Sequence, residues 1–183
     1  ETRRGELPVP SDAAIEGGEA RVVRNAPFPT RRQWVHATWI GVLMLGGGMG
    51  FTAYAEARDP REVIAFLNRF FSQAAICVER EGGFINKYLG DAFMAVFGTP
   101  FPLGDFRAAA IRAALAVREA VSEMNRASPG DEPFRVGMGL HAGPMVAGIV
   151  GSARRMEFTI IGDTVNTASR MEGLCREFEV EII

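Results

Sequence analysis

The stretch FINKYLGDAFMAVFG, residues 84–98, decides how the chain folds. Two runs rich in strand-forming residues, 84–88 and 92–97, lie on either side of the short segment Leu89-Gly90-Asp91. Two such runs joined by a short segment that contains glycine are typical of a β-hairpin. We therefore expect two antiparallel strands here, with the acidic residue Asp91 at the tip of their turn.

A helix and a strand are expected upstream of this hairpin. Pro60 suits the first turn of a helix, and apolar residues then recur at helical spacing as far as Gly82-Gly83, which ends the helix. Before it, the run from Trp39 to Leu45 is short, apolar and followed by glycine, which indicates a buried strand. The repeating apolar positions of the helix are Val63, Leu67, Phe70, Ala74 and Val78.

A second helix is expected downstream of the hairpin. Asp105 can cap its start, and the proline- and glycine-containing loop at 128–133 follows its end. Apolar residues at helical spacing are expected to form its buried stripe. They are Ile111, Leu115, Val117, Val121 and Met124.

The last part of the chain returns to strand-like patterns and closes with a short helix. This helix is expected at 163–171, with Asp163 as its cap. The strand-like runs before it lie at 134–140, 145–150 and 157–161.

The expected order of elements is β-α-β-β-α-β-β-α. Helices that cover one face of a mostly antiparallel sheet are the economical solution for that order, so we expect an α+β, ferredoxin-like fold. Residues 1–35 hold four prolines, scattered charges and no sustained apolar period, which is typical of a linker or partly ordered lead-in. Residues 36–183 are then expected to form one domain.

Composition excludes several classes of function. Twenty Lys and Arg residues against 22 Asp and Glu leave a net charge of −2, which argues against a protein that neutralises a nucleic-acid backbone. Two cysteines and two histidines give neither a disulfide framework nor zinc spacing. The chain begins at Glu1 with no basic-then-apolar leader, so we expect a cytoplasmic segment of a longer protein.

The uncharged stretch from Ala37 to Ala55 is long enough to raise the question of a membrane span or anchor. It is rich in glycine, and each glycine weakens a helix by about 1 kcal/mol relative to alanine, so a buried strand is favoured. The glycines from Gly46 to Gly50 also lack the third glycine of a dinucleotide-binding loop and the Gly-Lys-Ser/Thr end of a P-loop.

Four motifs occur together along the chain: Phe51-Thr52, FINKYLGDAFMAVFG at 84–98, RVGMGLHAG at 135–143 and FTIIGDTVNTASR at 158–170. In their order and spacing they resemble the catalytic domain of class III nucleotidyl cyclases, of the bacterial adenylate cyclase type. The resemblance covers about residues 37–183 and implies the ferredoxin-like nucleotidyl cyclase fold. It also implies a reaction in which the ribose 3′-oxygen of ATP attacks its own α-phosphate, giving cyclic AMP and pyrophosphate.

The resemblance implies roles for four side chains. Lys87 matches the family lysine that reads the adenine ring, and Thr159 matches the residue that accompanies it. A guanine-reading enzyme usually has an acid at the position of Lys87. Asn166 matches the residue that orients the ribose, and Arg170 matches the arginine that stabilises the transition state. A spacing of four places Asn166 and Arg170 on one helix face, and a guanidinium suits a phosphate that gains charge.

The resemblance also implies a metal site for Mg²⁺ or Mn²⁺ held by two aspartates. Asp91 matches one of them, but Gly47 occupies the position of the other. Glycine supplies no carboxylate, so the chain offers half of the expected metal site. The backbone amides of Phe51 and Thr52 are implied to approach the triphosphate, while the phenyl ring of Phe51 is equally suited to a core.

Two protomers share each active site in this family, so the implied partner is a second cyclase chain, either an identical copy or an intact cyclase that supplies both aspartates. The leading hypothesis is an adenylate cyclase domain in intracellular signalling whose activity is impaired by Gly47. The alternative is an inactive cyclase-like domain that binds nucleotide or a partner cyclase and regulates it. A local sequence error between Leu45 and Met49 is a further alternative. His141 and Asp163 are interpreted as structural, and the domain is expected to be cut short at Ile183.

Overall fold

The computed structural model describes residues 38–46, 51–56, 58–99, 102–129, 133–152 and 155–183. The expected lead-in at 1–35 lies outside these residues. The strands and helices follow the expected order, with one additional short helix after the first strand. They are β1 (Thr38–Gly46), α1 (Phe51–Glu56), α2 (Pro60–Arg80), β2 (Phe84–Leu89), β3 (Ala92–Phe97), α3 (Phe106–Arg126), β4 (Gly137–Ser152), β5 (Arg155–Ile161) and α4 (Asp163–Glu177).

The five strands form a sheet in the order β2-β3-β1-β4-β5, and every neighbouring pair is antiparallel. The antiparallel α+β class is therefore confirmed. β1 lies in the centre, where Leu43 pairs with Ala95 on one side and with Leu140 on the other. The uncharged stretch thus supplies a central strand, as expected. Within the described part of the chain, no helix has both the length and the apolar character that a membrane span needs.

The β2–β3 hairpin is confirmed. Leu89 pairs with Ala92, so Gly90 and Asp91 form a two-residue turn. Gly90 has a φ of +65°, a left-handed conformation that glycine adopts without steric cost. This turn fixes the register of the hairpin and places Asp91 at its tip.

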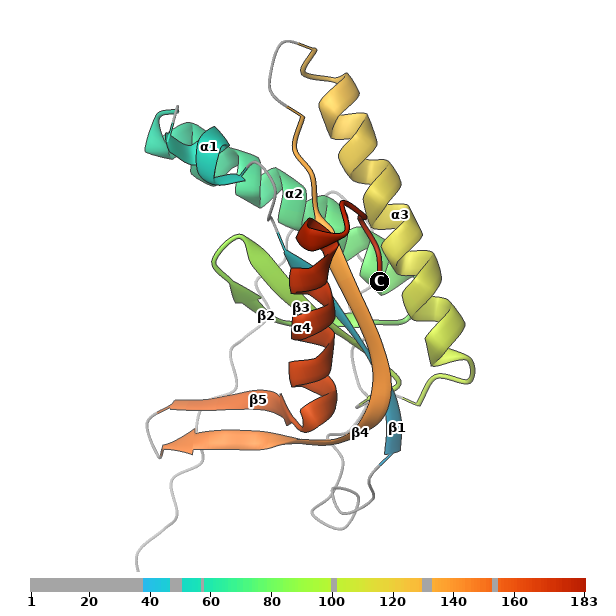
Figure 1. Ribbon diagram of the computed structural model, residues 1–183. Helices are drawn as coiled ribbons and strands as arrows, with labels where there is room; N and C mark the ends of the chain where they lie inside the picture. The colour runs from blue at the N-terminus through green and yellow to red at the C-terminus, as the bar shows by residue number, and fades with distance from the viewer. Residues whose placement is uncertain (1–37, 47–50, 57, 100–101, 130–132, 153–154) are drawn as a thin grey trace, which may run out of the picture.

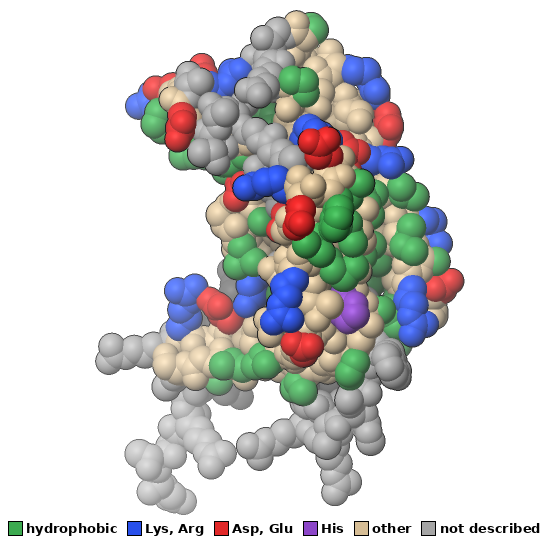
Figure 2. All heavy atoms as spheres, in the orientation of Figure 1, with side chains coloured by type: hydrophobic (Ala, Val, Ile, Leu, Met, Phe, Trp, Pro, Cys, Tyr) green, Lys and Arg blue, Asp and Glu red, His purple; other side chains and the backbone are tan. Residues whose placement is uncertain are grey.

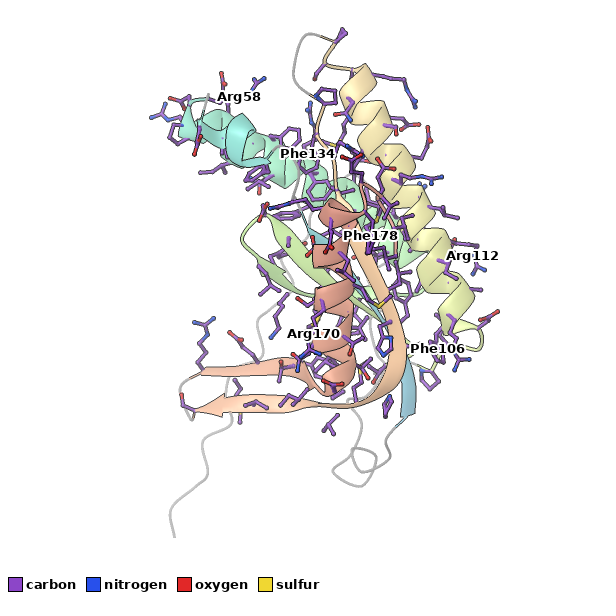
Figure 3. The ribbon with its side chains drawn as sticks, in the orientation of Figure 1. Arg58, Phe106, Arg112, Phe134, Arg170 and Phe178 are labelled. Atoms are coloured by element: carbon purple, nitrogen blue, oxygen red, sulfur yellow. The ribbon has the colours of Figure 1, made fainter. Side chains whose placement is uncertain are left out.

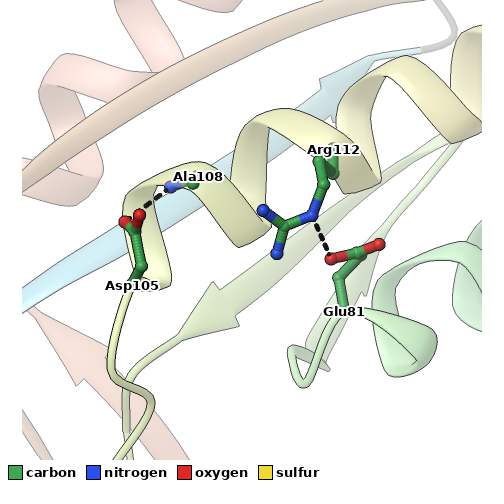
Figure 4. A network of polar contacts seen from close by, with 4 residues as sticks. All are labelled: Glu81, Asp105, Ala108 and Arg112. Atoms are coloured by element: carbon green, nitrogen blue, oxygen red, sulfur yellow. Dashed lines mark hydrogen bonds and ion pairs between the residues drawn. The ribbon is translucent and has the colours of Figure 1, made fainter.

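Both long helices begin at capping aspartates. The Asp59 side chain accepts a hydrogen bond from the Arg61 amide at 2.8 Å, and the Asp105 side chain accepts one from the Ala108 amide at 3.1 Å. An ion pair of 2.7 Å joins Arg112 of α3 to Glu81 at the end of α2 (Figure 4). Caps of this kind satisfy backbone N–H groups that the first helical turn leaves unpaired.

The expected buried stripe of α3 is partly wrong. Val117, Val121 and Met124 are buried, but Ile111 and Leu115 are exposed. Small side chains allow a helix to approach its neighbours closely, and this helix buries its alanine face instead of its larger aliphatic residues. The buried alanines are Ala109, Ala110, Ala113 and Ala114.

The sheet is covered on both faces, which corrects the expectation that all helices pack on one face. Side chains of β3 alternate: Phe93, Ala95 and Phe97 join the main core with α2 and α3, while Met94 and Val96 join a second, smaller core. Ala168 of α4 belongs to that second core. Figure 1 shows α4 on the opposite side of the sheet from α2 and α3. Because β3 has apolar side chains on both faces, helices must pack on both faces of the sheet, and α4 packs on the second one.

β4 is one strand of 16 residues, which joins the two strand-like runs expected at 134–140 and 145–150. Residues 137–145 pair with β1 and residues 146–152 pair with β5, so the strand changes partners close to Pro144. Proline lacks the N–H that a central ladder uses, and it is tolerated where pairing changes. The β4–β5 hairpin projects from the body of the domain (Figure 1).

The last helix is longer than expected and has a different cap. α4 runs to Glu177 rather than to 171, and Gly162 occupies the cap position with no side-chain hydrogen bond. Asp163 therefore is not the cap; it lies in the first turn, where a carboxylate interacts favourably with the helix dipole. After the helix the chain returns to β4, where the Ile183 amide donates to the Met138 carbonyl at 3.0 Å.

Candidate active site

The side chains of Lys87 and Thr159 meet between β2 and β5. The Lys87 ammonium donates a hydrogen bond to Thr159 Oγ1 at 3.1 Å, and both residues are half-buried. Lys87 lies on β2 and Thr159 on β5, the two strands at opposite ends of the sheet order. The projecting β4–β5 hairpin and the curvature of the sheet therefore bring together two residues that are 72 positions apart.

Asn166 and Arg170 lie on α4, and both side chains are exposed. They share one face of the helix, while Thr164, Ala168 and Cys175 face inward and are buried. The inward Thr164 hydroxyl donates to the Pro144 carbonyl at 2.7 Å and fixes the start of α4 against β4. Arg170 lies along α4 above the β4–β5 hairpin (Figure 3). The outer face of α4 thus carries an amide and a guanidinium free to reach a ligand.

Asp91 lies in a different part of the molecule, at the tip of the β2–β3 hairpin, and is half-buried. Leu45 pairs with Phe93, and Gly46 pairs with Gly137, so β1 leaves the sheet beside this tip. The last residues of β1 are therefore close to the hairpin tip that carries Asp91. Position 47 itself lies outside the described residues.

The electrostatics of this edge involve Glu172 of α4. Burial raises the pKa of the Glu172 carboxyl above its ordinary value, Arg176 opposes this rise, and the charge of Asp91 adds to it. A Cβ placed on Gly137 would lie 3.3 Å from Glu172 Oε1, so this carboxylate lies directly over the glycine that pairs with the end of β1. The negative charge of Asp91 therefore acts on the C-terminal half of α4.

The Phe51 ring has a structural role. It packs edge-on against Phe134 at 6.3 Å between ring centroids and belongs to the rim of the main core. Phe51 and Thr52 are also the first residues of α1. The role assigned to their backbone amides stays a prediction.

The candidate residues therefore form two sets. Lys87 is bonded to Thr159, and Asn166 and Arg170 share the exposed face of the helix on the same side of the sheet. Among the described residues, no hydrogen bond or ion pair joins Asp91 to either pair.

The carboxylates present do not complete a Mg²⁺ or Mn²⁺ site. In the part of the chain that the structure describes, no three His, Cys, Asp or Glu residues come together in a way that could hold a metal ion. Asp91 is a single carboxylate, and Gly47 supplies none. Hard divalent cations take their protein ligands mainly from carboxylates, so this chain provides half of the donor set expected for the metal.

Sequence reasoning missed Asn86, which precedes Lys87. Its side-chain amide donates to the Phe158 carbonyl at 3.1 Å, one residue before Thr159. The only sequence signal was a polar residue inside a strand that is otherwise mostly apolar. His141 lies within β4, opposite Val42, and its structural interpretation stays a prediction.

The β4–β5 hairpin exposes a group of large apolar side chains, each more than half exposed in the single chain. Figure 2 shows apolar side chains along this hairpin, where it projects from the molecule. Large apolar side chains that are exposed together on one hairpin are typical of an interaction surface. The residues are Val146, Ile149, Val150, Met156 and Ile161.

Comparison with known proteins agrees with this geometry. The family model described as the adenylate and guanylate cyclase catalytic domain matches residues 43–183. The chain is 36% identical over 140 residues to an adenylate cyclase of Anabaena cylindrica, covering 73% of this chain and 27% of that protein. Two solved structures, the guanylyl cyclase Cya2 and the adenylyl cyclase CyaB from P. aeruginosa, both show 30% identity and a TM-score of 0.69. Both cover 74% of this chain, with 70% of the first and 71% of the second.

The fold, the motif residues and these similarities agree, and the chain belongs to the family of adenylate and guanylate cyclase catalytic domains. It spans about a quarter of the length of the Anabaena relative. The two solved structures resemble it equally in fold but are described with different bases, so the substrate must be argued from individual side chains.

Proposed function

We propose that this domain is an adenylate cyclase, which converts ATP to 3′,5′-cyclic AMP and pyrophosphate in intracellular signalling. The observation that carries the proposal is the hydrogen bond between Lys87 and Thr159. Lys87 is the only lysine among the 20 cationic residues of the chain, the others being arginines. A compact ammonium, rather than a planar guanidinium or an acid, thus stands at the position that reads the base.

The donor pattern of this pair suits adenine. A lysine ammonium has three donors, and the bond to Thr159 uses one of them. A remaining donor matches the ring nitrogen N1 of adenine, which accepts a hydrogen bond. The second lone pair of Thr159 Oγ1 can accept from the adenine amino group. Guanine carries an N–H at the N1 position, so its donor would face the donor of Lys87.

The exposed face of α4 supplies the groups for the chemistry. The 3′-oxygen of the ribose attacks the α-phosphorus, the bond from this phosphorus to the oxygen bridging the β-phosphate breaks, and pyrophosphate leaves. Asn166 orients the ribose, and Arg170 neutralises the charge that builds on the phosphate oxygens. A divalent metal supplies charge neutralisation when it is bound, and in this chain Asp91 is the carboxylate available to hold it.

A second protomer completes the site. Lys87, Thr159, Asn166 and Arg170 would come from one chain, and Asp91 with the backbone amides of Phe51 and Thr52 from the other. The exposed apolar side chains of the β4–β5 hairpin support this arrangement, since they lie beside Thr159 and are uncovered in a single chain. We place the dimer in the cytoplasm, either free or as part of a larger protein.

A second candidate function follows from one specific observation, the glycine at position 47. A domain with an intact base-reading pair and half of its metal carboxylates would bind nucleotide without turning it over efficiently. Such a domain would regulate a partner cyclase, or pair with an intact cyclase that donates both aspartates. Production of cyclic AMP by the purified chain with Mn²⁺ separates the two functions.

The proposed substrate is tested by reversing the charge of Lys87, the residue proposed to bind the adenine base. ATP and GTP analogues compete against a fluorescent nucleotide, and cyclic AMP and cyclic GMP are measured in parallel. We expect the chain to prefer ATP, and Lys87→Glu to reverse the preference. Arg118→Glu, which introduces the same charge on the exposed side of α3, serves as the matched control and should leave the preference unchanged. A preference for GTP in the unmodified chain would overturn the proposal.

A further inference from the structure

β2 contains an irregularity directly before Lys87. Ile85 pairs with Ala95 and Lys87 pairs with Met94, so Asn86 has no partner across the hairpin and forms a β-bulge. A bulge inserts one extra residue into a strand and re-aims the side chains that follow it. The regular alternation of side chains between the two faces of the sheet is therefore interrupted at Asn86.

The bulge decides which face of the sheet Lys87 occupies. Directly paired residues in an antiparallel ladder lie on the same face. Ile85 and its partner Ala95 belong to the main core, whereas Met94, the partner of Lys87, belongs to the second core under α4. In a regular ladder that continued from Ile85 and Ala95, Asn86 would pair with Met94 and Lys87 with Phe93, on the face of the main core. The bulge thus turns Lys87 toward Thr159.

Asn86 holds this irregular segment against β5. Its amide nitrogen donates to the Phe158 carbonyl at 3.1 Å, and Lys87 donates to Thr159 at 3.1 Å. Two consecutive residues of β2 are therefore bonded to two consecutive residues of β5. The Phe84 and Phe158 rings, 5.9 Å apart, pack beside these bonds. Asn86 is the polar member that links the two backbones.

The other end of the Asn86 side chain is unusual. Its Oδ1 atom is buried and has no hydrogen-bond partner among the described residues. A buried acceptor without a partner destabilises the fold, and an apolar side chain of similar size would avoid that cost. Packing alone therefore does not account for an amide here, whereas the need for a donor toward Phe158 does.

We propose that Asn86 is a positioning residue for base recognition, which holds the bulge of β2 against β5 so that Lys87 and Thr159 meet at the spacing that reads adenine. The inference rests on the proposed function, because it assigns Asn86 a part in the same base-reading site. Asn86 acts through Lys87 and is not expected to touch the nucleotide.

The first test measures the pair without nucleotide. Because Lys87 is the only lysine, labelling with lysine that carries ¹⁵N at Nζ gives a single side-chain ammonium signal in the NMR spectrum. Thr159→Val removes the acceptor and defines the position of that signal when the pair is broken. Asn86→Ala should move the Lys87 signal toward this broken position. Asn86→Asp, which keeps the shape but loses the donor, should do the same.

A matched control is available in Asn125. Its side chain also donates to a backbone carbonyl, that of Phe134, at 2.9 Å, but it lies at the end of α3 far along the chain from β5. Asn125→Ala should lower the melting temperature and leave the Lys87 signal in place. An unmoved signal in Asn86→Ala would overturn the proposal. A signal that moves in Asn86→Ala but not in Asn86→Asp would also overturn it, since the role would then be one of shape. If the aspartate variant does not fold, the alanine variant decides.

The second test measures base preference by competition binding. Asn86→Ala is expected to lower the ratio of ATP to GTP affinity about fivefold, as loss of one well-placed hydrogen bond does. Asn125→Ala should leave the ratio unchanged. If the unmodified chain shows no preference for ATP, the proposed function fails, while the ammonium signal still decides whether Asn86 positions Lys87. If Asn86→Ala keeps both the preference for ATP and the position of the Lys87 signal, the inference about Asn86 is overturned while the proposed function stands.

Discussion

The two halves of the candidate site are built to different degrees within one chain. In the base-reading half, Lys87 and Thr159 are joined by a hydrogen bond, and the strands that carry them are packed into the second core. In the metal half, Asp91 lies at a turn, and glycine stands at position 47 in the segment after β1. The base-reading half is part of the folded sheet, whereas the metal half depends on single carboxylates at the ends of strands.

This difference shows which losses a fold tolerates. Replacing a carboxylate in a connecting segment removes chemistry but leaves the core intact. Replacing a residue such as Asn86 disturbs the packing of two strands as well as the site. The base-reading half can therefore persist in a domain whose metal half has been lost, and experiments that restore or break each half separately test this view.

The largest effect is expected when Asp91 and Arg170 are removed in separate variants, which are measured alone and as a mixture. In a Gly47→Asp background, Asp91→Ala and Arg170→Ala should each lower cyclase activity by at least about a hundredfold, since both act on the charge of the phosphates. A one-to-one mixture should recover about a quarter of the parental activity, because half of the dimers are mixed and each of these has one intact site of two.

Arg118→Ala, an exposed arginine of α3, is the control and should keep parental activity. Heterodimer formation is checked by pulling down one tagged variant with the other. If mixed dimers form and activity does not return, Asp91 and Arg170 act on the same nucleotide from one chain, and the two halves do not belong to different protomers.

The next effect is expected from restoring the metal half. Gly47→Asp should raise the turnover of ATP with Mn²⁺ at least tenfold, which corresponds to about 1.4 kcal/mol of barrier. Gly48→Asp carries the same charge one residue further along and should give no comparable gain. Circular dichroism establishes that each variant is folded. Equal rates in Gly47→Asp and the unmodified chain would show that a missing carboxylate is not what limits this half.

A smaller effect is expected from weakening the base-reading half. Thr159→Val has nearly the same shape but removes the acceptor of Lys87, so the preference for ATP over GTP should fall about fivefold. Thr164→Val removes a hydroxyl that donates to Pro144 and is the matched control. It should lower the melting temperature without changing the preference. Competition binding measures both variants, and an unchanged preference in Thr159→Val argues against the pair as the base reader.

The smallest effect is expected on the pH dependence of the melting temperature, through the carboxyl group of Glu172. Because burial holds the pKa of Glu172 above its ordinary value, the folded chain keeps this proton to a higher pH than the unfolded chain. Stability is therefore lost as pH rises through the raised pKa, and this loss is absent below the ordinary value of about 4.3. Glu172→Gln should melt at a higher temperature than the unmodified chain at pH 7, with the difference shrinking toward pH 4.

Glu177→Gln, an exposed position of the same helix, provides the comparison and should show no such dependence on pH. Since the charge of Asp91 adds to the rise of the pKa, Asp91→Asn should reduce the benefit of Glu172→Gln. A benefit that stays constant from pH 4 to pH 7 contradicts the account given for Glu172.

Most of the fold could be predicted because its local signals agree with its packing. The Gly-Asp turn, the capping residues Asp59 and Asp105 and the apolar face of α2 act within a few residues of themselves. The predictions that proved wrong concern features that depend on contacts between residues far apart in the sequence. Ile111 and Leu115 are exposed because the alanine face of α3 meets the core. β4 continues through Pro144 because it exchanges one partner strand for another.

The candidate site shows the same division. The resemblance to the cyclase family implied that Lys87 and Thr159 act together, and the structure places their side chains in contact. The bulge at Asn86 could not be predicted, since it depends on the register between β2 and β3 and on a carbonyl of β5 that lies 72 positions away. A polar residue in a strand carries no information about which neighbour it meets.

The change of partners within β4 has a consequence for hydrogen exchange. Its first residues lie between β1 and the returning segment 181–183, whereas its last residues pair, within the described part of the chain, with β5 alone. Amide protons of one continuous strand should thus exchange on two timescales, slow before Pro144 and fast beyond Val146. Local opening of the hairpin that carries Thr159 is therefore expected to leave the part of β4 that pairs with β1 intact.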